Sequence, residues 1–385
     1  MDSFKETYNF LVGPAGTGKT TMINKLIKEN DNIFLTATTH KAKSHIKSNK
    51  VQTIHSFLGY KLVCLPGVTK SKFKNSEYIH GSTVIVDEAS MLQKDLFDKI
   101  IQITEKYSLK WIFVGDHFQL PPVGDNFSVF KLITAENSVV LDKYYRFQGE
   151  LMVFLHNLRK LRESTPIEII DYIKNSKCDS VIIEPDYYKW INTFNTDSSD
   201  CFAISYRNDI VNRFSNAKRE HLFGRNAKEF EVGDRIVAQD IPNHQYLETT
   251  IVKIEKVPIV LKGLTAKAWK IYISDTEFFY KISRESLSVH ERNKKIFSLA
   301  LSKHPEKIEE LSDEYRKYIS TCYPDISYNY AGTVHKSQGS TYHNVYVNIR
   351  DILEMHKKGY LSNENFFRTV YTALTRAKEK LILLV

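Results

Sequence analysis

The sequence predicts an α/β protein built on parallel sheets, with a smaller all-β insertion. Between Tyr8 and about Val140, short apolar runs alternate with helical segments, which is typical of a parallel sheet covered on both faces. From 229 to 284, several short strand-like runs separated by turns indicate a small inserted barrel. After Tyr328 the alternation of strand, turn and helix returns. The length of 385 residues indicates roughly two to four domains.

The individual elements follow from the same patterns. The first half supplies four candidate strands, Tyr8 to Val12, Ile33 to Ala37, Thr83 to Val86 and Lys110 to Val114. Each ends in a polar or glycine-containing turn, and ligands of such sheets bind at the carboxyl ends of the strands. Further along we expect a helix from Glu150 to Glu163, a strand from Cys201 to Ser205, β runs at 234–238, 250–254, 269–273 and 278–282, a charged helical block from Glu285 to Ser320 and a last strand from Leu381 to Val385. For the charged block, a solvated helical hairpin is favoured over a lever packed against another domain.

A glycine-rich run separates the first strand from the helical segment Thr20 to Glu29. It reads Gly13-Pro14-Ala15-Gly16-Thr17-Gly18-Lys19-Thr20-Thr21 and fits the pattern G-x-x-x-x-G-K-[ST]. Its backbone N–H groups can close around phosphate oxygens at the start of a helix, where the dipole also favours anions. Lys19 would reach the β- and γ-phosphates, and the Thr20 hydroxyl would hold Mg2+.

An acidic pair, Asp87 and Glu88, ends the buried strand that begins at Thr83. Asp87 would share the Mg2+ with Thr20, and Glu88 would orient and deprotonate the attacking water. A glycine-rich loop alone can be an ordinary turn, and an Asp-Glu pair alone is usually solvated surface. The two in this order, each in its expected local context, predict an NTPase that uses ATP and Mg2+.

Composition and charge narrow the class of protein. The formal net charge is +9 with a pI near 9.0, and clustered Lys and Arg gain affinity for phosphate backbones by releasing counterions. The alternative, that the basic surface only aids solubility, stays open. No apolar run reaches about 18 residues and no basic-then-apolar leader opens the chain, so we expect an intracellular protein that does not contact a membrane. The four scattered cysteines indicate neither a zinc site nor a disulfide framework.

Three further motifs follow downstream. Gly115-Asp116-His117-Phe118-Gln119 comes after another buried strand, where a Gln can contact a γ-phosphate or the attacking water. Near the C-terminus lie Gly332-Thr333-Val334-His335-Lys336-Ser337-Gln338-Gly339 and Tyr371-Thr372-Ala373-Leu374-Thr375-Arg376. In this order the motifs resemble those of superfamily 1 helicases, and the Thr-x-His-Lys-x-Gln-Gly form resembles the group B branch of RecD and the phage helicase Dda. The resemblance runs from Gly13 to the end of the chain.

The resemblance implies two RecA-like P-loop NTPase domains with ATP in the cleft between them. The first would comprise 1–57 and 82–150, and the second 151–228 and 326–385. Residues 58–81 would form a β-hairpin pin, and 229–325 an SH3-like β-barrel with a helical hook. Gly339 would contact the nucleotide from the second domain. Arg376 and Arg146 would act as arginine fingers, because a guanidinium that arrives across an interface stabilises the transition-state charge of phosphoryl transfer.

The resemblance also implies contacts with a single nucleic acid strand. Hydroxyl, imidazole and ammonium groups suit sequence-independent phosphate contacts. The residues that match the family's contacts are Thr38, His40, Lys41, His55, Ser56, Thr333, His335 and Lys336. In the predicted pin, Phe73 would stack on the last base pair, with a basic surface loop as the equal alternative.

We therefore predict an ATP-dependent DNA helicase that moves along single strands, with a 5′ to 3′ direction implied by the resemblance. An RNA helicase and a DNA-stimulated ATPase that does not separate strands are the alternatives, and a small-molecule P-loop kinase is disfavoured. Expected partners are single-stranded DNA, junctions with duplex, and single-strand-binding or replisome proteins. We expect a monomer in the cytoplasm of a bacterium or phage-infected cell, acting in replication or recombination.

The sequence departs from the family in one respect. Only twelve residues precede Gly13 and none is the glutamine that usually contacts adenine, so base selectivity is open. The chain accepts several NTPs, uses an aromatic such as Tyr8 or Tyr145 on the base, or lacks its natural N-terminus.

Overall fold

The computed structural model divides the chain into two compact units. The first comprises Met1–Leu58, Ser76–Lys218 and Tyr330–Val385, and the second Gly59–Asn75 and Arg219–Asn329. The structure describes residues 7–30, 32–44, 51–73, 78, 80–122, 124–125, 127–145, 149–261 and 264–385, without the side chains of 44, 61–62 and 69–73.

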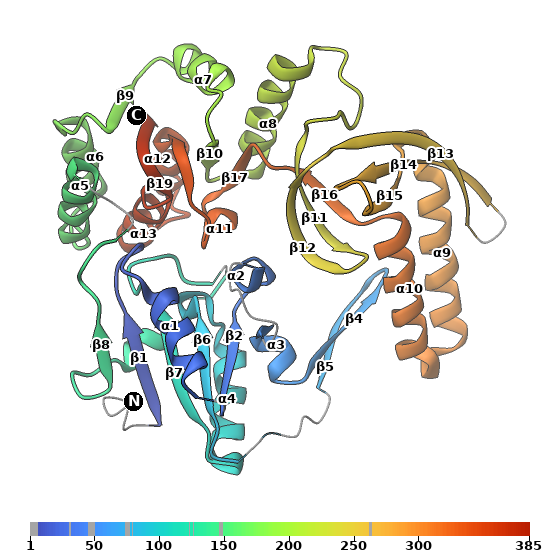
Figure 1. Ribbon diagram of the computed structural model, residues 1–385, viewed down its shortest axis with the longest axis horizontal. Coiled ribbons are helices and arrows are strands. Elements are labelled where there is room, and N and C mark those ends of the chain that lie inside the picture. Colours follow the sequence, from blue (N-terminus) through green and yellow to red (C-terminus); the bar gives the residue numbers. More distant parts are fainter. Residues whose placement is uncertain are drawn as a thin grey trace. The chain divides into compact units, whose positions relative to one another are not determined.

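The first unit begins with a six-stranded sheet of order β3-β2-β6-β7-β1-β8 (Figure 1). All of its neighbouring strands are parallel. Its strands are β1 (Tyr8–Val12), β2 (Ile33–Ala37), β3 (Val51–Thr53), β6 (Thr83–Asp87), β7 (Lys110–Gly115) and β8 (Ser138–Val140). The four strands predicted from the sequence form its centre. The two edge strands, β3 and β8, were not predicted, and each has only three residues.

Alternate residues of this sheet pack against helices on opposite faces, as the period of a strand requires. Leu11 and Ile112 share a cluster with Ile23 of α1, whereas the ring of Phe113 contacts that of Phe97 of α4. The helical segments here are α1 (Lys19–Lys28), α2 (His40–Ser44), α3 (Ile54–Phe57), α4 (Lys94–Tyr107) and the 3₁₀ turns η1 (Ala89–Met91) and η2 (Val129–Leu132).

A second parallel sheet, of order β17-β10-β18-β19-β9, also belongs to the first unit. Its strands are β9 (Val181–Glu184), β10 (Cys201–Ser205), β17 (Ala331–Thr333), β18 (Tyr342–Asn348) and β19 (Ala377–Leu384). The accompanying helices are α5 (Gly149–Lys160), α6 (Pro166–Lys174), α7 (Tyr187–Thr196), α8 (Asn208–Phe223), α11 (Val334–Ser337), α12 (Ile349–Lys357) and α13 (Asn363–Leu374). One large apolar cluster joins α5, α6 and α13 to this sheet. The unit therefore contains the two α/β sheets that the sequence predicts.

The second unit contains two antiparallel three-stranded sheets, of orders β12-β11-β16 and β13-β14-β15, which share an apolar core. Their strands are β11 (Arg235–Ile241), β12 (His244–Thr250), β13 (Lys253–Leu261), β14 (Leu264–Tyr272), β15 (Phe278–Ile282) and β16 (Asp325–Tyr328). The predicted strand at 250–254 was wrong, because the chain passes from β12 to β13 within it. The SH3-like character of this module stays a prediction.

A β-hairpin, β4 (Tyr60–Leu65) and β5 (Val68–Phe73), and a helical pair, α9 (Leu287–Lys303) and α10 (Ile308–Cys322), complete the second unit. The 3₁₀ turns η3 (Arg284–Ser286) and η4 (Pro305–Lys307) precede the two helices. Val63 and Leu65 of the hairpin pack with Phe297 and Tyr315, and Cys64 N donates to Ser312 Oγ over 2.9 Å. The helical pair is therefore not the purely solvated hairpin that the sequence favoured. The domain boundaries drawn from the sequence stay a prediction.

All four cysteines are described, and none forms a disulfide. Among the described helices, none has both the length and the apolar character needed to cross a bilayer.

Candidate functional site

The glycine-rich run lies between β1 and α1, as predicted. Gly16 and Gly18 both have φ of 82°, a left-handed conformation that glycine adopts without strain. At Gly13 a Cβ would lie 2.5 Å from Leu141 O, so only glycine fits there. Lys19 Nζ donates to Gly13 O and to Pro14 O, each over 2.8 Å. The shape of the loop thus depends on its glycines, and the Lys19 side chain is hydrogen-bonded back to the loop carbonyls.

The flanking residues of the run differ in exposure. Pro14, Ala15 and Thr17 are buried, and Thr17 Oγ1 donates to Pro14 O over 2.9 Å. Thr20 and Thr21 are exposed in the first turn of α1. Their hydroxyls are therefore open to a ligand at the start of this helix.

The acidic pair ends β6 as predicted. Asp87 is buried, and burial together with the neighbouring Glu88 charge raises the pKa of its carboxyl to about 7. Glu88 N donates to Asp87 Oδ1 over 2.9 Å, and the Lys19 charge acts to lower the same pKa. Glu88 has φ of 52°, which is uncommon for a residue with a Cβ and is found in strained functional segments. The structure thus brings Lys19, Asp87 and Glu88 together.

The loop after β7 carries Gln119, which is almost fully buried. Its Oε1 atom has no hydrogen-bond partner among the residues that the structure describes. Arg368 Nη1 donates to His117 O over 2.6 Å and to Gln119 O over 2.8 Å. Burial lowers the pKa of His117 to about 4, so its ring is neutral near pH 7. The loop is therefore fixed by a residue of α13, beside the second sheet.

The segment after α11 faces the acidic pair. A Cβ on Gly339 would lie 4.0 Å from Glu88 Oε1. In the described part of the chain, Gln338 Oε1 and Ser340 Oγ are buried without a hydrogen-bond partner. A buried polar atom left unpaired is costly, so these two atoms are available to a polar ligand.

Arg376 is 2% exposed and lies beside this segment. Its Nε donates to Thr372 O over 2.9 Å, its Nη1 to Ser340 O over 3.3 Å, and its Nη2 to Thr375 Oγ1 over 2.9 Å. The guanidinium of Arg376 is therefore buried rather than on the surface. Its role as a finger stays a prediction, and Arg146, the other predicted finger, lies outside the described residues.

The glycine loop and the acidic pair together fit a nucleoside triphosphate with a divalent cation. The loop offers backbone N–H donors at the start of a helix. Burial and the Glu88 charge disfavour ionisation of the Asp87 carboxyl, and a bound cation would favour it. Of the two aromatic candidates for the base, the Tyr145 ring lies 3.5 Å from where a Cβ on Gly18 would be. Tyr8 instead packs against Phe97 and Phe113.

Residues predicted to contact the nucleic acid strand lie at equivalent positions in the two sheets. Thr53 ends β3 and caps α3, and Thr333 ends β17 and caps α11, each by accepting a backbone N–H bond. Both strands are edges of their sheets, and each is followed by a histidine, His55 or His335, whose pKa burial lowers. The Ser56 amide makes the bond to Thr53.

A hydrogen bond also joins the two halves at residues that are predicted to contact the nucleic acid strand. Lys41 Nζ of α2 donates to Lys336 O over 2.9 Å. Thr38 Oγ1 donates to Glu88 O over 3.1 Å, which ties the same segment to the acidic pair. Burial is the main cause that lowers the pKa of His55, and the His40 charge acts in the same direction. The Phe73 side chain lies outside the described residues.

Comparison with known proteins gives two family matches, one in each half of the chain. Residues 3–177 match an AAA domain, and residues 328–384 match a UvrD-like helicase C-terminal domain. RecD, a RecBCD enzyme subunit of Buchnera aphidicola, is 24% identical over 96% of this chain and 68% of its own length. An uncharacterized protein of Acanthamoeba polyphaga mimivirus is 26% identical over 97% and 94%. These matches support an ATP-hydrolysing helicase similar to the superfamily 1 group B enzymes.

A solved structure supports the fold of this helicase. The crystal structure of Bacteroides Pif1 bound to ssDNA has a TM-score of 0.58 at 17% identity, over 99% of this chain and 89% of that one. The two sheets of the first unit are accordingly RecA-like.

Sequence reasoning missed several residues of this helicase that shape the site. Arg368 lies outside the predicted motifs, eight residues before Arg376, so the sequence did not single it out. The turn after β10, Tyr206 and Arg207, is held by Asp351, whose Oδ2 accepts from both backbone N–H groups over 2.9 and 3.0 Å. A polar turn after a buried strand is the signal that located Asp87, and it would have located this turn as well.

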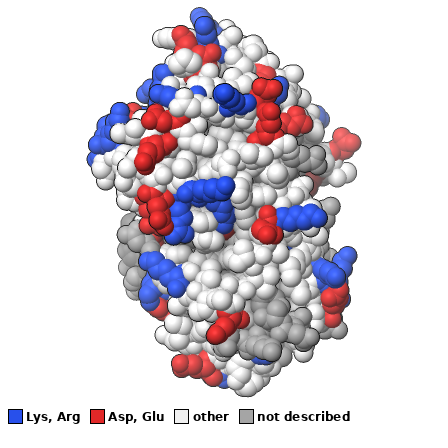
Figure 2. All heavy atoms as spheres, turned by 90° about the vertical axis from the view of Figure 1, so that its left-hand side faces the viewer, with Lys and Arg blue, Asp and Glu red and all other residues white. Residues whose placement is uncertain are grey.

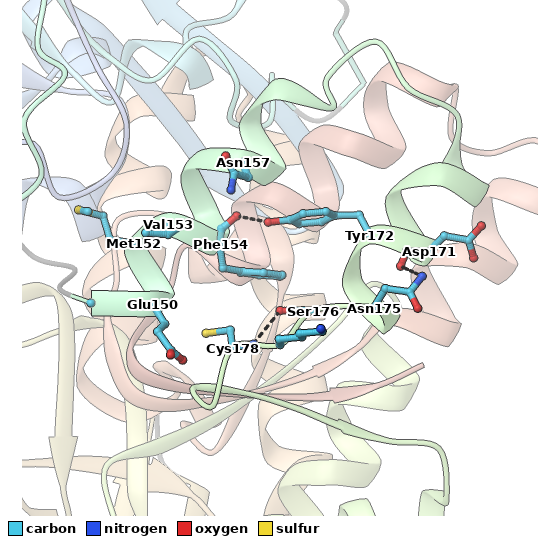
Figure 3. A pocket seen from close by; sticks show the side chains of 12 residues that line it. Glu150, Met152, Val153, Phe154, Asn157, Asp171, Tyr172, Asn175, Ser176 and Cys178 are labelled. Atoms are coloured by element: carbon cyan, nitrogen blue, oxygen red, sulfur yellow. Dashed lines mark hydrogen bonds between the residues drawn. The ribbon is translucent and has the colours of Figure 1, made fainter.

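The helicase also has an open pocket of about 800 Å³ between α5 and α6, lined by Met152, Phe154 and the ring of Tyr172 and by polar side chains (Figure 3). Its described lining contains none of the predicted nucleotide or strand contacts. On the face that includes the side of α5 and α6, Lys and Arg are interspersed with Asp and Glu (Figure 2). The excess positive charge is therefore not gathered into one patch on that face.

Proposed function

We propose that this chain is an ATP-dependent DNA helicase that moves along single-stranded DNA and separates duplex ahead of it. The observation that carries the proposal is the approach of Gly339, from one RecA-like half, to Glu88 of the other. Such a junction makes nucleotide binding sensitive to the relative position of the halves. A relative, PIF1 of Emericella nidulans, is an ATP-dependent DNA helicase, and Bacteroides Pif1 was crystallised bound to ssDNA, which favours DNA over RNA.

In this proposal the residues divide the chemistry. Lys19 and the loop amides bind the phosphates, and Glu88 orients the attacking water and accepts its proton. Thr20 and Asp87 hold Mg2+, which supplies positive charge to the phosphate oxygens. Gln119 contacts the γ-phosphate or the water. Arg376 and Arg146 stabilise the charge that develops in the transition state.

Movement along the strand follows from the two sets of contact residues. Thr38, His40, Lys41, His55 and Ser56 belong to the first half, and Thr333, His335 and Lys336 to the second. If the two sets tighten on the phosphates at different stages of ATP turnover, closing and opening of the cleft becomes a step along the strand. The bond between Lys41 and the Lys336 carbonyl supports such a linkage. We infer a monomeric motor with 5′ to 3′ direction that works at single-strand and duplex junctions in bacterial or phage-infected cytoplasm, alongside single-strand-binding or replisome proteins.

Steady-state ATP hydrolysis with and without a short oligo(dT), and with oligo(U) of equal length, tests the proposal. Strong stimulation by oligo(dT) over oligo(U) is expected. Greater stimulation by oligo(U) would mean an RNA helicase, and no stimulation by either would overturn the nucleic acid motor. Loss of hydrolysis on chelation of Mg2+ would support the metal site.

Unwinding of tailed duplexes tests the direction. We expect loading on a 5′ single-stranded tail. Loading on a 3′ tail with none on a 5′ tail would contradict the direction and leave the helicase activity intact. Stimulated hydrolysis without unwinding of either substrate would instead mean an ATPase that does not separate strands.

A further inference from the structure

The loop 116–120 continues from β7 of the first sheet, yet its hydrogen bonds and ion pairs to described residues outside the loop itself are all with the second half. Asp116 is fully buried, accepts a bond from Tyr371 Oη over 2.8 Å, and lies 3.3 Å from Arg159 Nη1 of α5. Gln338 Nε2 donates to Leu120 O over 3.3 Å. Leu120 and Phe118 pack in the apolar cluster of the second sheet. The loop is therefore held by the second half, although β7, the strand that it follows, belongs to the first sheet.

Arg368 of α13 provides the most direct of these anchors. One nitrogen, Nη1, donates to both His117 O and Gln119 O. The other edge of the guanidinium donates to Glu364 Oε1 from Nε over 3.0 Å and from Nη2 over 2.8 Å. A planar guanidinium bonded on two edges has little rotational freedom. The backbone on both sides of Phe118 is thereby fixed relative to α13.

Thr372, one turn further along α13, connects this loop to Arg376. Its hydroxyl accepts from Leu120 N over 3.2 Å, and its carbonyl accepts from Arg376 Nε over 2.9 Å. The same helix therefore holds the backbone of Gln119 on one side and the guanidinium of Arg376 on the other.

We propose that Arg368 is a positioning residue for ATP hydrolysis, which fixes Gln119 relative to Arg376 and makes the loop 116–120 move with the second half. This inference rests on the proposed function, since it assigns Gln119 and Arg376 to the same reaction. Arg368 acts through the loop backbone and touches no reacting atom. Displacement of a positioned group by about 1 Å can cost up to about 100-fold in rate.

The test measures kcat and KM for ATP with saturating oligo(dT), for the wild type, Arg368→Ala and Arg368→Lys. We expect Arg368→Ala to lower kcat by about 10- to 100-fold with KM changed by less than about threefold. Arg368→Lys should recover part of the loss, because an ammonium can still reach a carbonyl. Arg350→Ala is the matched control, since Arg350 also donates to two carbonyls, Pro185 O and Val385 O, at an exposed site on α12. It should keep kcat within about twofold.

A double mutant separates positioning from general stability. If Arg368 acts through Gln119, Arg368→Ala should slow the Gln119→Ala enzyme by less than about twofold. Independent, multiplicative losses would overturn the inference, as would wild-type kcat in Arg368→Ala or a loss fully explained by a lower melting temperature. A wild type without DNA-stimulated hydrolysis would instead mean failure of the proposed function.

Discussion

Lys19 binds its own loop in this structure, through the carbonyls of Gly13 and Pro14. If the same side chain also binds phosphate, as we predict, its removal distinguishes the nucleotide site from the site that binds the nucleic acid strand. Lys19→Ala should lower ATP turnover by at least about 100-fold, because a positive charge on the transferred phosphoryl group is lost. The affinity for oligo(dT), measured by fluorescence anisotropy, should change by less than about threefold. Loss of strand binding in a folded variant would show that the two sites are not separate.

Arg376 gives a second residue-scale prediction, refined by its burial. Removal of the side chain leaves three acceptors without this donor, which costs roughly 1 to 3 kcal/mol of stability, so Arg376→Lys is a better test than Arg376→Ala. A finger acts mainly in the transition state, so kcat should fall about 1000-fold while ATP affinity stays within about threefold. Stopped-flow binding of a fluorescent ATP analogue checks the second value. An equal loss of affinity and turnover would indicate a ground-state role.

The sequence predicted the residues of the site whose position follows from local pattern. Asp87 and Gln119 follow buried strands, and Lys19 follows a glycine loop, so each can be located within about ten residues of chain. Arg368 could not be found in this way, because its partners are two backbone carbonyls about 250 residues away in sequence and carry no side-chain signature.

At the scale of elements, the hairpin β4–β5 joins the helical pair rather than standing alone. Tyr60 and Phe73 are directly opposite each other, so two glycines can replace 61–72 and close the chain between them. If the hairpin separates strands, this excision should abolish unwinding and leave oligo(dT)-stimulated hydrolysis within about threefold. A gel assay of a tailed duplex measures the first, and phosphate release the second.

The excision also removes Val63 and Leu65 from their cluster with Phe297 and Tyr315, so its melting temperature must be compared with the assay temperature. Ser312→Ala is the matched control, since it removes only the side chain that accepts from Cys64 N. Unwinding that persists after excision would assign strand separation to another element.

The sequence predicted the buried strands correctly but not the half-exposed or short edge strands, for a physical reason. Buried parallel strands such as β6 and β7 are continuous apolar runs and were found. The half-exposed strands β12 and β13 mix polar and apolar residues, and their register depends on pairing rather than on local sequence. The edge strands β3 and β8 are too short to carry a period.

For the whole molecule, sequence order and compact units do not coincide. Residues 59–75 leave the first sheet and join 219–329, while the first unit is assembled from three separate stretches. Each unit has apolar cores of its own, described by separate clusters. Patterns along the chain identify such insertions by a change of period, but which insertions pack together depends on contacts between distant segments.

This division predicts where a nucleotide stabilises the molecule. The predicted ATP contacts all belong to the first unit, so binding of Mg2+ with a slowly hydrolysed ATP analogue should stabilise that unit alone. At about 100 times the dissociation constant the gain is about 2.7 kcal/mol, which slows exchange of its most protected amides about 100-fold. Hydrogen exchange read by mass spectrometry should show this gain in β18 and α13 and less than about twofold change in β14 and α10. Equal protection of both sets would mean that the units open as one cooperative body, and that the insertion senses the nucleotide through it.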